Sequence, residues 1–464
     1  MFQTVEFPIW LVVLVALLAA ISTLDRILVP SVRWFFRRRM ERVVARINLR
    51  LQRPIEPFKL ARRHDMIQRL IYDPKVAEAI QEHAEAKGIP ENVAFEAAHR
   101  YAREIVPSFS ATAYFGFAIK ITRWFSRSFY RVRLRYSDEE SIAQIAPTAT
   151  VVFVMNHRSN MDYFLVTYLA AERSALSYAV GEWARVWPLQ GFLRFMGAYF
   201  IRRKSHNLLY RRVLGRYVQM ATEAGVAQAV FPEGGLSLSG KVGPPKLGIL
   251  SYVISGFHGD DGRDVVFVPI ALNYDRVLED RVLIEAATTG SRKFGFSFFK
   301  MLGFVLRQFR FFLTGRFHRF GYAAVSFGQP LSLREFAAEV PKATHDELTK
   351  TVGREMMKRV REVVPVLPVP LVALILTRST KPLSREQIEA QMGEIIQGLK
   401  EIGAHVHIPR ENISYATDVG LRILLLRQFI REASGTYTIT EDSKEFTAYY
   451  AASIEHLVDG ELVI

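Results

Sequence analysis

A histidine and an aspartate five residues apart are the first side chains in this sequence that could do chemistry. His157 and Asp162 lie in the segment NHRSNMD, directly after the apolar run TVVFVM. If a helix begins near Asn160, a carboxylate in its first turn can reach back to the imidazole. The aspartate then holds one ring nitrogen, and the other nitrogen can take a proton from a hydroxyl group. The spacing predicts a general-base pair, and the alternative is a structural turn histidine.

A second segment places an acid beside two glycines, again directly after an apolar run. Glu233, Gly234 and Gly235 open the segment EGGLSLSGKVGPPKLG. Glycines allow close backbone approach and present free N–H groups. The segment nearly matches a phosphate-binding loop that ends at Lys241, but Val242 stands where a hydroxyl would hold magnesium. Nucleotide hydrolysis is therefore disfavoured.

Two adjacent arginines follow a third short apolar run, in the segment GAYFIRR. Arg202 and Arg203 come directly after this expected strand, so at least one side chain should point over the end of the sheet. The planar guanidinium fork matches phosphate oxygens. The pair predicts an anion-binding position, and the alternative is a solvated pair of surface charges.

The remaining composition narrows the chemistry and the partners. The chain has no cysteine, which excludes disulfides, thiolate metal sites and a cysteine nucleophile. Its 11 histidines form no cluster with metal-ligand spacing, so no metal is expected. The formal net charge of +15 predicts a polyanionic partner, either nucleic acid or an anionic membrane.

The arrangement of the basic residues favours the membrane. Residues 7–24 carry no charge and are followed by an arginine-rich stretch over 33–53. This pattern predicts a transmembrane anchor over residues 1–30 with the rest of the chain in the cytoplasm; a buried core helix and a signal peptide are the alternatives. Basic-aromatic stretches over 117–136 and 293–320 predict helices in the headgroup region that contact anionic lipids. No nucleic-acid motif is present, so nucleic acid is not expected as a partner.

The predicted elements alternate in the central part of the chain. Short β-branched runs alternate with helical patterns, which predicts an α/β fold with a largely parallel sheet. Helices are expected before and after this part, and a proline-rich linker is expected over 363–370. The expected strands are 150–154, 198–201, 226–231, 265–272 and 323–327. After the anchor, the expected regions are a basic juxtamembrane and helical region (31–140), an α/β catalytic domain (141–335) and a C-terminal helical domain (336–464).

Four blocks of this chain, taken in order, resemble one family. They are similar to the membrane-bound glycerol-3-phosphate acyltransferases of the large bacterial type and their dihydroxyacetone-phosphate relatives. The blocks are NHRSNMDYF, GAYFIRR, FPEGGLSLSGKVGPPKLG and VPIALNYDRVLE, with FGQPLSLREF following. The resemblance covers roughly residues 55–460 and is close from 150 to 335. It implies a glycerolipid-acyltransferase-like central sheet flanked by helices.

The resemblance also implies roles for individual residues. His157 corresponds to the general base, Asp162 orients it, and Glu233 completes the catalytic set. The positions implied to bind substrate are Arg202, Arg203, Gly234, Gly235, Ser237, Lys241 and Pro269. One departure concerns Leu236 and Leu238, because the family usually carries arginines at these two positions. Their loss leaves the identity of the acceptor open.

The activity implied by the resemblance needs neither a metal nor a cofactor. The enzyme would move a fatty acyl group from acyl-CoA or acyl carrier protein to the sn-1 hydroxyl of glycerol 3-phosphate, giving lysophosphatidic acid. It would act at the cytoplasmic face of the inner membrane. Lysophosphatidic acid, dihydroxyacetone phosphate or another lysolipid are alternative acceptors. The alternative from another class is a membrane- or nucleic-acid-binding protein without activity.

Overall fold

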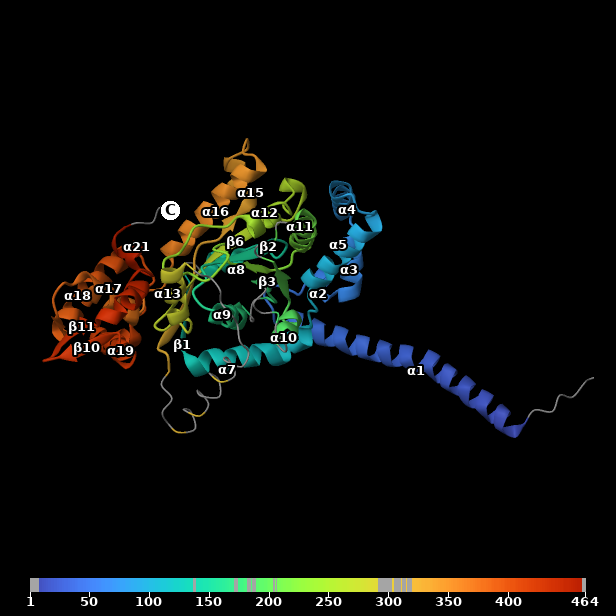
Figure 1. Ribbon diagram of the computed structural model, residues 1–464, viewed down its shortest axis with the longest axis horizontal. Coiled ribbons are helices and arrows are strands. Elements are labelled where there is room, and N and C mark those ends of the chain that lie inside the picture. Colours follow the sequence, from blue (N-terminus) through green and yellow to red (C-terminus); the bar gives the residue numbers. More distant parts are fainter. Residues whose placement is uncertain are drawn as a thin grey trace, which may run out of the picture. The chain divides into compact units, whose positions relative to one another are not determined.

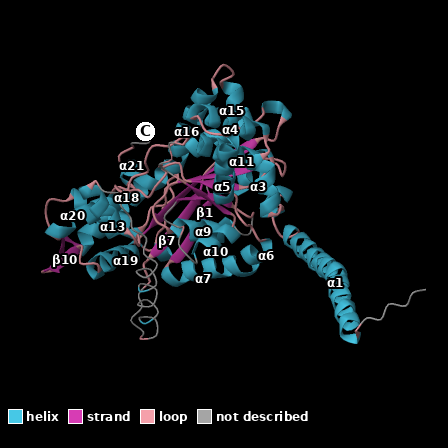
Figure 2. Cartoon of the chain, turned by 45° about the vertical axis from the view of Figure 1, so that its right-hand side comes forward, coloured by secondary structure: helices cyan, strands magenta, loops and turns pink. Residues whose placement is uncertain are grey.

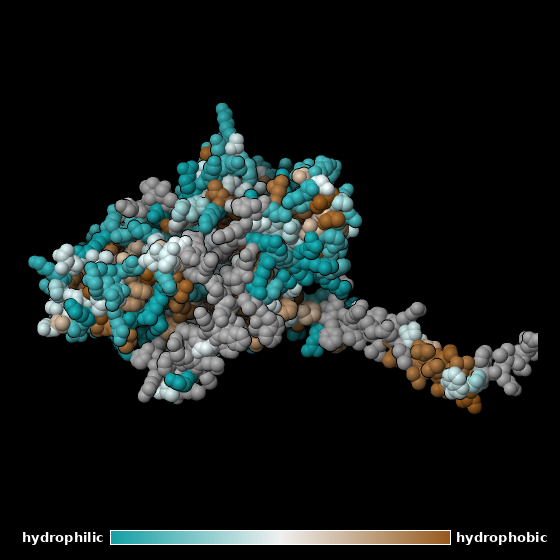
Figure 3. Space-filling view, viewed as in Figure 1, coloured by the Kyte–Doolittle hydropathy of each residue, from teal (hydrophilic) through white to brown (hydrophobic). Residues whose placement is uncertain are grey.

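The computed structural model describes residues 8–136, 139–170, 174–181, 185, 189–202, 205, 207–290, 303, 310, 314 and 319–460. The chain divides into two compact units, Met1–Pro54 and Ile55–Ile464. The first unit contains one helix of 40 residues, α1 (Ile9–Asn48) (Figure 1). Apolar side chains are exposed near its N-terminal end (Figure 3). Among the described helices, none has both the length and the apolar character needed to cross a membrane. The anchor over residues 1–30 therefore stays a prediction.

A mixed central sheet organises the second unit. In the described residues it has eight strands, and seven of them lie in the order β1-β7-β6-β2-β5-β3-β4, while β8 pairs with β6. Their bounds are β1 (Arg131–Tyr136), β2 (Thr150–Met155), β3 (Ser177–Gly181), β4 (Ala198–Ile201), β5 (Gln228–Val230), β6 (Val265–Tyr274), β7 (Tyr322–Phe327) and β8 (Leu331–Ser332). All five strands expected from the sequence are present, and the α/β prediction is confirmed.

The direction of the strands decides where side chains from different blocks can meet. Strands β6, β2, β5, β3 and β4 form consecutive parallel pairs. Strand β7 runs antiparallel to β6, and β1 runs parallel to β7. The carboxyl ends of the five parallel strands therefore share one edge of the sheet, which is where sites are built in such folds.

Helices cover both faces of the sheet, as Figures 1 and 2 show. α7 packs on α9, whereas α11, α12 and α16 form a second group in which α16 packs directly on β2 and β6. The helices that precede β7 are α2 (Pro57–Leu60), α3 (Arg63–Ile71), α4 (Pro74–Lys87), α5 (Glu91–Ile105), α6 (Ala111–Ala113), α7 (Ile119–Phe129), α8 (Glu139–Gln144), α9 (Met161–Ala170), α10 (Leu189–Phe195), α11 (Leu208–Glu223), α12 (Gly248–Ile254) and α13 (Asp280–Thr289). A π-helix, η1 (Tyr114–Ala118), lies between α6 and α7.

Strand β1 corrects the prediction made for residues 117–136. The basic-aromatic composition predicted one helix at the membrane surface, and α7 is indeed helical, but residues 131–136 pair with β7. Arg131, Arg133 and Arg135 alternate with apolar residues in β1, which is the two-residue period of a strand. The other basic-aromatic stretch, 293–320, falls almost wholly outside the described residues.

The C-terminal part is helical, as expected, and also contains a small antiparallel sheet. The predicted linker over 363–370 is wrong, because this stretch is buried, Val366 bridges to Val406, and Pro368 begins α17. Proline is well suited to a first helical turn, where its missing N–H costs nothing. The elements are α15 (Leu333–Glu339), α16 (His345–Glu362), α17 (Pro368–Arg378), β9 (Leu383–Ser384), α18 (Arg385–Glu401), α19 (Ile413–Leu426), β10 (Ile430–Ala433), β11 (Thr436–Ile439), α20 (Lys444–Ala451) and α21 (Glu455–Val458).

Candidate active site

The predicted histidine–aspartate pair is in contact at the carboxyl end of β2. The strand ends at Met155, and α9 begins at Met161, within one residue of the expected start. The Nδ1 atom of His157 lies 2.9 Å from Oδ2 of Asp162, and both residues are almost completely buried. The turn between strand and helix thus folds the carboxylate back onto the imidazole.

Asp162 is held by three further donors. The backbone N–H groups of Arg158 and Ser159 donate to Oδ2 at 2.7 and 3.1 Å, and the hydroxyl of Tyr274 donates to Oδ1. Burial, reinforced by the charge of Asp162, raises the pKa of Tyr274 well above its ordinary value, so this hydroxyl stays protonated. With Nδ1 of His157 committed to this carboxylate, Nε2 is the ring nitrogen that can accept a proton.

A second carboxylate, the half-buried Glu279, holds the other side of the same turn. Its side chain accepts hydrogen bonds from the Ser159 hydroxyl at 2.7 Å and from the Asn160 N–H at 3.2 Å. Burial raises the pKa of Glu279. The N–H groups of residues 157–160 are therefore all engaged, by Glu233, Asp162 and Glu279. The turn that carries the histidine consequently offers no free N–H for an oxyanion.

Glu233 connects the histidine to the loop that follows β5. Its Oε1 accepts the N–H of His157 at 2.9 Å, and its Oε2 accepts the N–H of Gly243 at 3.2 Å. The N–H of Ser237 donates to the carbonyl of His157 at 2.8 Å. Burial raises the pKa of Glu233 to about 7, although both hydrogen bonds act in the opposite direction. This geometry makes Glu233 the residue that fixes the position of the backbone at His157.

The loop between Glu233 and Lys241 uses its other residues for shape and packing. Gly234 adopts φ +64°, and a side chain there would lie 2.9 Å from Lys246. Leu236 and Leu238, which replace the family's arginines, pack against the hydrophobic core. Ser237 donates its hydroxyl to the carbonyl of Lys241 at 2.7 Å. Gly235 is buried within the loop.

Arg158 is a residue of this site that sequence reasoning missed. It is 1 % exposed, its Nη1 donates to the carbonyl of Gly240, and its guanidinium lies 4.8 Å from the ring centroid of Tyr449 in α20. Gly240 adopts φ +86°, and a Cβ there would lie 2.0 Å from the carbonyl oxygen of Tyr449, so only glycine fits. Arg158 directly follows His157 in the sequence, so its role in the site could have been suspected. Nothing in the sequence indicated that Tyr449 would contact it.

Lys241, predicted to bind substrate, forms an ion pair with the C-terminal part of the chain. Its Nζ lies 2.9 Å from Glu455 in α21, and both side chains are exposed by more than a third. Together with the contacts of Tyr449, this pair holds the loop after β5 against α20 and α21.

Arg202 lies directly after β4 and is engaged by a carboxylate of the protein. Its Nε and Nη2 donate to the two oxygens of Glu104 in α5, at 2.9 and 2.7 Å. Arg185 donates to the same carboxylate. These contacts lower the pKa of Glu104 despite its burial, which acts in the opposite direction. Arg203, the other predicted phosphate ligand, lies outside the described residues.

Pro269 lies inside β6 rather than in a loop. It is buried opposite Val154. β6 pairs with β8 before this position and with β7 after it, so the missing N–H of proline falls where β6 changes its partner. Its predicted contact with substrate stays a prediction.

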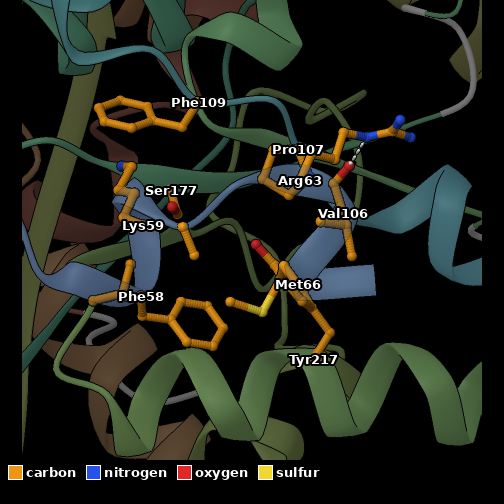
Figure 4. A pocket seen from close by; sticks show the side chains of 11 residues that line it. Phe58, Lys59, Arg63, Met66, Val106, Pro107, Phe109, Ser177 and Tyr217 are labelled. Carbon is orange, nitrogen blue, oxygen red and sulfur yellow. Dashed lines mark hydrogen bonds between the residues drawn. The ribbon is translucent and has the colours of Figure 1, made fainter. Parts of the chain in front are cut away.

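A separate pocket lies at the amino end of β3, where the strand begins at Ser177, and not at the edge that carries His157. Figure 4 shows Lys59 reaching into it beneath Phe109, with the ammonium 4.5 Å from the ring centroid. The Lys59 ammonium donates to the carbonyl of Ala175 at 2.8 Å. Burial lowers the pKa of Lys59 well below its ordinary value. The pocket thus belongs to the packing of the N-terminal helices on the sheet.

Comparison with known proteins agrees with the blocks at the sheet edge. Residues 133–273 match the acyltransferase family model, and residues 305–458 match the model of the glycerol-3-phosphate acyltransferase C-terminal region. The chain is 30 % identical over 380 residues to a glycerol-3-phosphate acyltransferase of Pseudomonas fluorescens (strain SBW25). It is 31 % identical over 364 residues to one of Ectopseudomonas mendocina (strain ymp).

These alignments cover most of this chain and a smaller part of the relatives. They include 78 and 74 % of this chain but 44 and 42 % of the two relatives, so the chain spans less than half the length of the curated relatives it matches. A solved structure, the 1-acyl-sn-glycerophosphate acyltransferase of Thermotoga maritima, is similar at 19 % identity over 54 % of this chain and 78 % of that one, with a TM-score of 0.32.

Proposed function

We propose that this chain, a member of the glycerol-3-phosphate acyltransferase family, transfers a fatty acyl group from a thioester to the sn-1 hydroxyl of glycerol 3-phosphate. The thioester is acyl-CoA or acyl carrier protein, and the product is lysophosphatidic acid. The observation that carries the proposal is the contact between His157 and Asp162 at the carboxyl end of β2. A buried pair of this kind suits one task, the removal of a proton from a hydroxyl group.

Residues of this chain account for each proton transfer in the proposed reaction. Nε2 of His157 takes the hydroxyl proton while the acceptor oxygen forms a bond to the thioester carbonyl carbon. The tetrahedral intermediate then collapses, the carbon–sulfur bond breaks, and the leaving thiolate takes the proton from the imidazolium. Asp162 keeps the imidazole in the required tautomer and stabilises its charged form. None of these steps requires a metal, and the described residues contain no group of carboxylates and histidines that could hold one.

Since the N–H groups of the histidine turn are engaged, the oxyanion must be stabilised by other donors. The loop after Gly234 is the nearest stretch of backbone, because Ser237 and Glu233 both bind the backbone of His157. Preorganised donors of this kind contribute about 3–4 kcal/mol each in other enzymes.

The leucines at positions 236 and 238 favour one second candidate, a lysolipid acceptor. Both side chains pack against the core instead of presenting cations to a phosphate. An acceptor with an acyl chain would tolerate this apolar loop better than glycerol 3-phosphate would. Dihydroxyacetone phosphate is a further phosphate-bearing alternative.

We also infer attachment to the cytoplasmic face of an anionic membrane. Two features support this: large apolar side chains are exposed along the first half of α1, and Phe117 and Trp124 are exposed among the basic residues around α7. Apolar and cationic side chains together bind anionic lipid surfaces. Flotation with vesicles of anionic and neutral lipid tests this inference, and equal recovery with both types, or none, would contradict it.

The decisive experiment is an acyl-transfer assay on the purified full chain with both donor types. Glycerol 3-phosphate, dihydroxyacetone phosphate and lysophosphatidic acid are supplied as separate acceptors, and the products are separated by thin-layer chromatography. We expect lysophosphatidic acid from glycerol 3-phosphate as the main product. Exclusive acylation of lysophosphatidic acid would establish the second candidate, and no transfer to any acceptor would leave the non-enzymatic binding protein.

A further inference from the structure

Four arginines gather at the C-terminal end of α5, and two of them bind its backbone. Arg63 donates to the carbonyls of Arg103 and Val106, the latter at 3.0 Å (Figure 4). Arg194 donates to the carbonyl of Glu104 at 3.3 Å. Carbonyls at the end of a helix attract cations, so these two arginines have a structural role.

The other two arginines bind the carboxylate of Glu104, and their guanidinium groups also lie over aromatic rings. Arg202 donates hydrogen bonds to both oxygens of Glu104, and Arg185 donates to one of them through Nη2. The Nε of Arg185 is buried and has no hydrogen-bond partner among the described residues. Two planar forks that converge on a small anion with spare donors match the oxygens of a phosphate better than a single carboxylate.

The position of the two arginines connects them with the general base. Arg202 follows β4 directly, Arg185 lies four residues after β3, and these strands are parallel neighbours. His157 and Glu233 emerge at the same edge of the sheet, after β2 and β5. The arginine pair therefore lies at the same edge of the sheet as the imidazole, with β5 and β3 between β2 and β4.

The cluster of Arg185, Arg202 and Glu104 has two positive charges and one negative charge, and part of it is exposed to solvent. Glu104 faces the forks of both Arg185 and Arg202, which leaves one positive charge uncompensated within this trio. Crowding of cations is evident at the neighbouring Arg194, where burial, followed by the charges of Arg63 and Arg185, lowers the pKa. The side chain of Arg202 is 39 % exposed and that of Glu104 14 %. Arg202 is thus open to solvent on one side, where a phosphate dianion can reach its fork and compete, with two negative charges against one, for the same donors.

With Arg202 as the phosphate ligand that the resemblance implies, we propose that Arg185 is a second ligand of the acceptor's phosphate monoester, and that Glu104 occupies both arginines until the phosphate displaces it. This inference rests on the proposed function for the identity of the acceptor. A competitor within the protein reduces the apparent affinity of the ligand by the fraction of molecules whose site is open. Glu104 would thus set the acceptor concentration at which the enzyme works.

The substitution Glu104→Gln tests the proposal because it removes the charge and keeps the shape. We expect KM for glycerol 3-phosphate to fall by about threefold to tenfold, with little change in KM for the acyl donor. The matched control is Glu96→Gln, since Glu96 lies on the same helix, its side chain is 67 % exposed, and its carboxylate lies 4.0 Å from His99. This control should leave both constants unchanged.

Calorimetric titration of the full chain with glycerol 3-phosphate alone separates this inference from the proposed function. Tighter binding to the Glu104→Gln variant than to the wild type supports the inference even if no acyl transfer is ever observed. Arg185→Gln should weaken the same binding by about tenfold, since one forked charge-assisted contact is lost. Thermal unfolding of each variant checks that it is folded.

Two results would overturn the proposal. Unchanged or weaker binding of glycerol 3-phosphate to folded Glu104→Gln would mean that Glu104 positions the arginines instead of competing for them. A lower KM for acyl-CoA with an unchanged KM for the acceptor would assign the arginine pair to the phosphates of the donor.

Discussion

The two halves of the candidate site differ in burial and in the kind of contact that holds their side chains. At the ends of β2 and β5, His157, Asp162 and Glu233 lie in a buried network where each carboxylate accepts several hydrogen bonds. At the ends of β3 and β4, Arg185 and Arg202 lie half-exposed on one carboxylate. The first half has one arrangement that burial and hydrogen bonds enforce. The second half has partly exposed ion pairs, which in our proposal the acceptor's phosphate replaces.

From this difference we infer different tasks for the two halves. Proton transfer needs fixed geometry, because a small displacement of the reacting groups costs much of the rate. Binding a charged substrate needs the reverse, a site whose internal contacts give way at small cost. Substitutions in the buried half should therefore act on kcat and stability, and substitutions in the exposed half on KM.

Removal of the general base gives the largest expected effect. We expect His157→Ala to lower kcat by about 10³–10⁴-fold, because the hydroxyl then loses its proton acceptor, and Asp162→Asn to act similarly by presenting the wrong tautomer. Steady-state acyl-transfer kinetics on folded variants measure this. Activity of His157→Ala within a few-fold of wild type would remove the basis for distinguishing the two halves.

Arg158 tests whether the buried half depends on its cation. We expect Arg158→Met to lower kcat by about a hundredfold, since the loop after β5 loses its contact at Gly240 and the geometry at His157 shifts. The charge of Arg158 also lowers the pKa of Glu233, so the pH at half-maximal activity should rise in this variant.

Arg158→Lys is the matched comparison, because it keeps the charge and loses the fork. It should retain the pH midpoint of the wild type with an intermediate kcat. Equal pH midpoints for all three proteins would show that Arg158 contributes packing alone.

Several of these elements could be predicted from the sequence, because they depend on residues that are close together in the chain. The strands that follow one another as β-branched runs, and the contact between His157 and Asp162, are decided within a few residues of chain. β3 was missed because its segment SYAVG is short and has a single β-branched residue. β1 was missed because its basic-aromatic composition outweighed the alternation of its arginines.

The partners of the site residues could not be predicted, because they come from distant parts of the chain. Glu104 precedes Arg202 by 98 residues, and Tyr449 follows Ser237 by 212. Nothing in the spacing of either block indicates which carboxylate or ring will face it. The block pattern of the resembled family indicated Arg202 or Arg203 as a phosphate ligand, but it could not show that Arg202 is paired with Glu104.

Glu233 gives an effect on stability that depends on pH. Burial raises its pKa from 4.5 to about 7, so the folded state holds this proton more tightly than the unfolded state. The stabilisation is complete below pH 4.5 and is lost as the pH rises through 7, a change of about 3 kcal/mol. We expect urea midpoints followed by tryptophan fluorescence to fall less across this range for Glu233→Gln than for wild type.

Asp275 provides the control for this measurement. Burial raises its pKa from 3.8 to about 7 with the same sign, but its carboxylate accepts the N–H groups of Tyr322 and Val369, away from the general base. Asp275→Asn should therefore flatten the pH dependence of stability without the change in kcat expected for Glu233→Gln. Identical kinetic effects of the two substitutions would contradict the role given to Glu233.

For the exposed half, we predict the effect of substituting Arg202 on KM. We expect Arg202→Ala to raise KM for glycerol 3-phosphate by about tenfold, with a smaller change in kcat, because the lost contact stabilises the bound acceptor as much as the transition state. Arg263→Ala is a suitable control, since this arginine is comparably exposed and binds Glu56 and the carbonyl of Thr148. A fall in kcat with an unchanged KM would place Arg202 with the buried half instead.

Substitution of Lys241 has the smallest expected effect. It tests whether a residue of this loop affects activity because it is buried or because it lies on the loop. It lies on the same loop as Glu233, yet its ammonium is 53 % exposed and pairs with Glu455, which is 36 % exposed. Exposed pairs contribute about 0.2–1 kcal/mol, because solvent screens them and ordering two long side chains costs entropy. We expect Lys241→Gln to change KM for the acceptor by less than about threefold and stability by less than about 1 kcal/mol. A double-mutant cycle with Glu455→Gln measures the coupling of the pair. A loss of kcat approaching that of Arg158→Met would show that membership of this loop, and not burial, makes a residue critical.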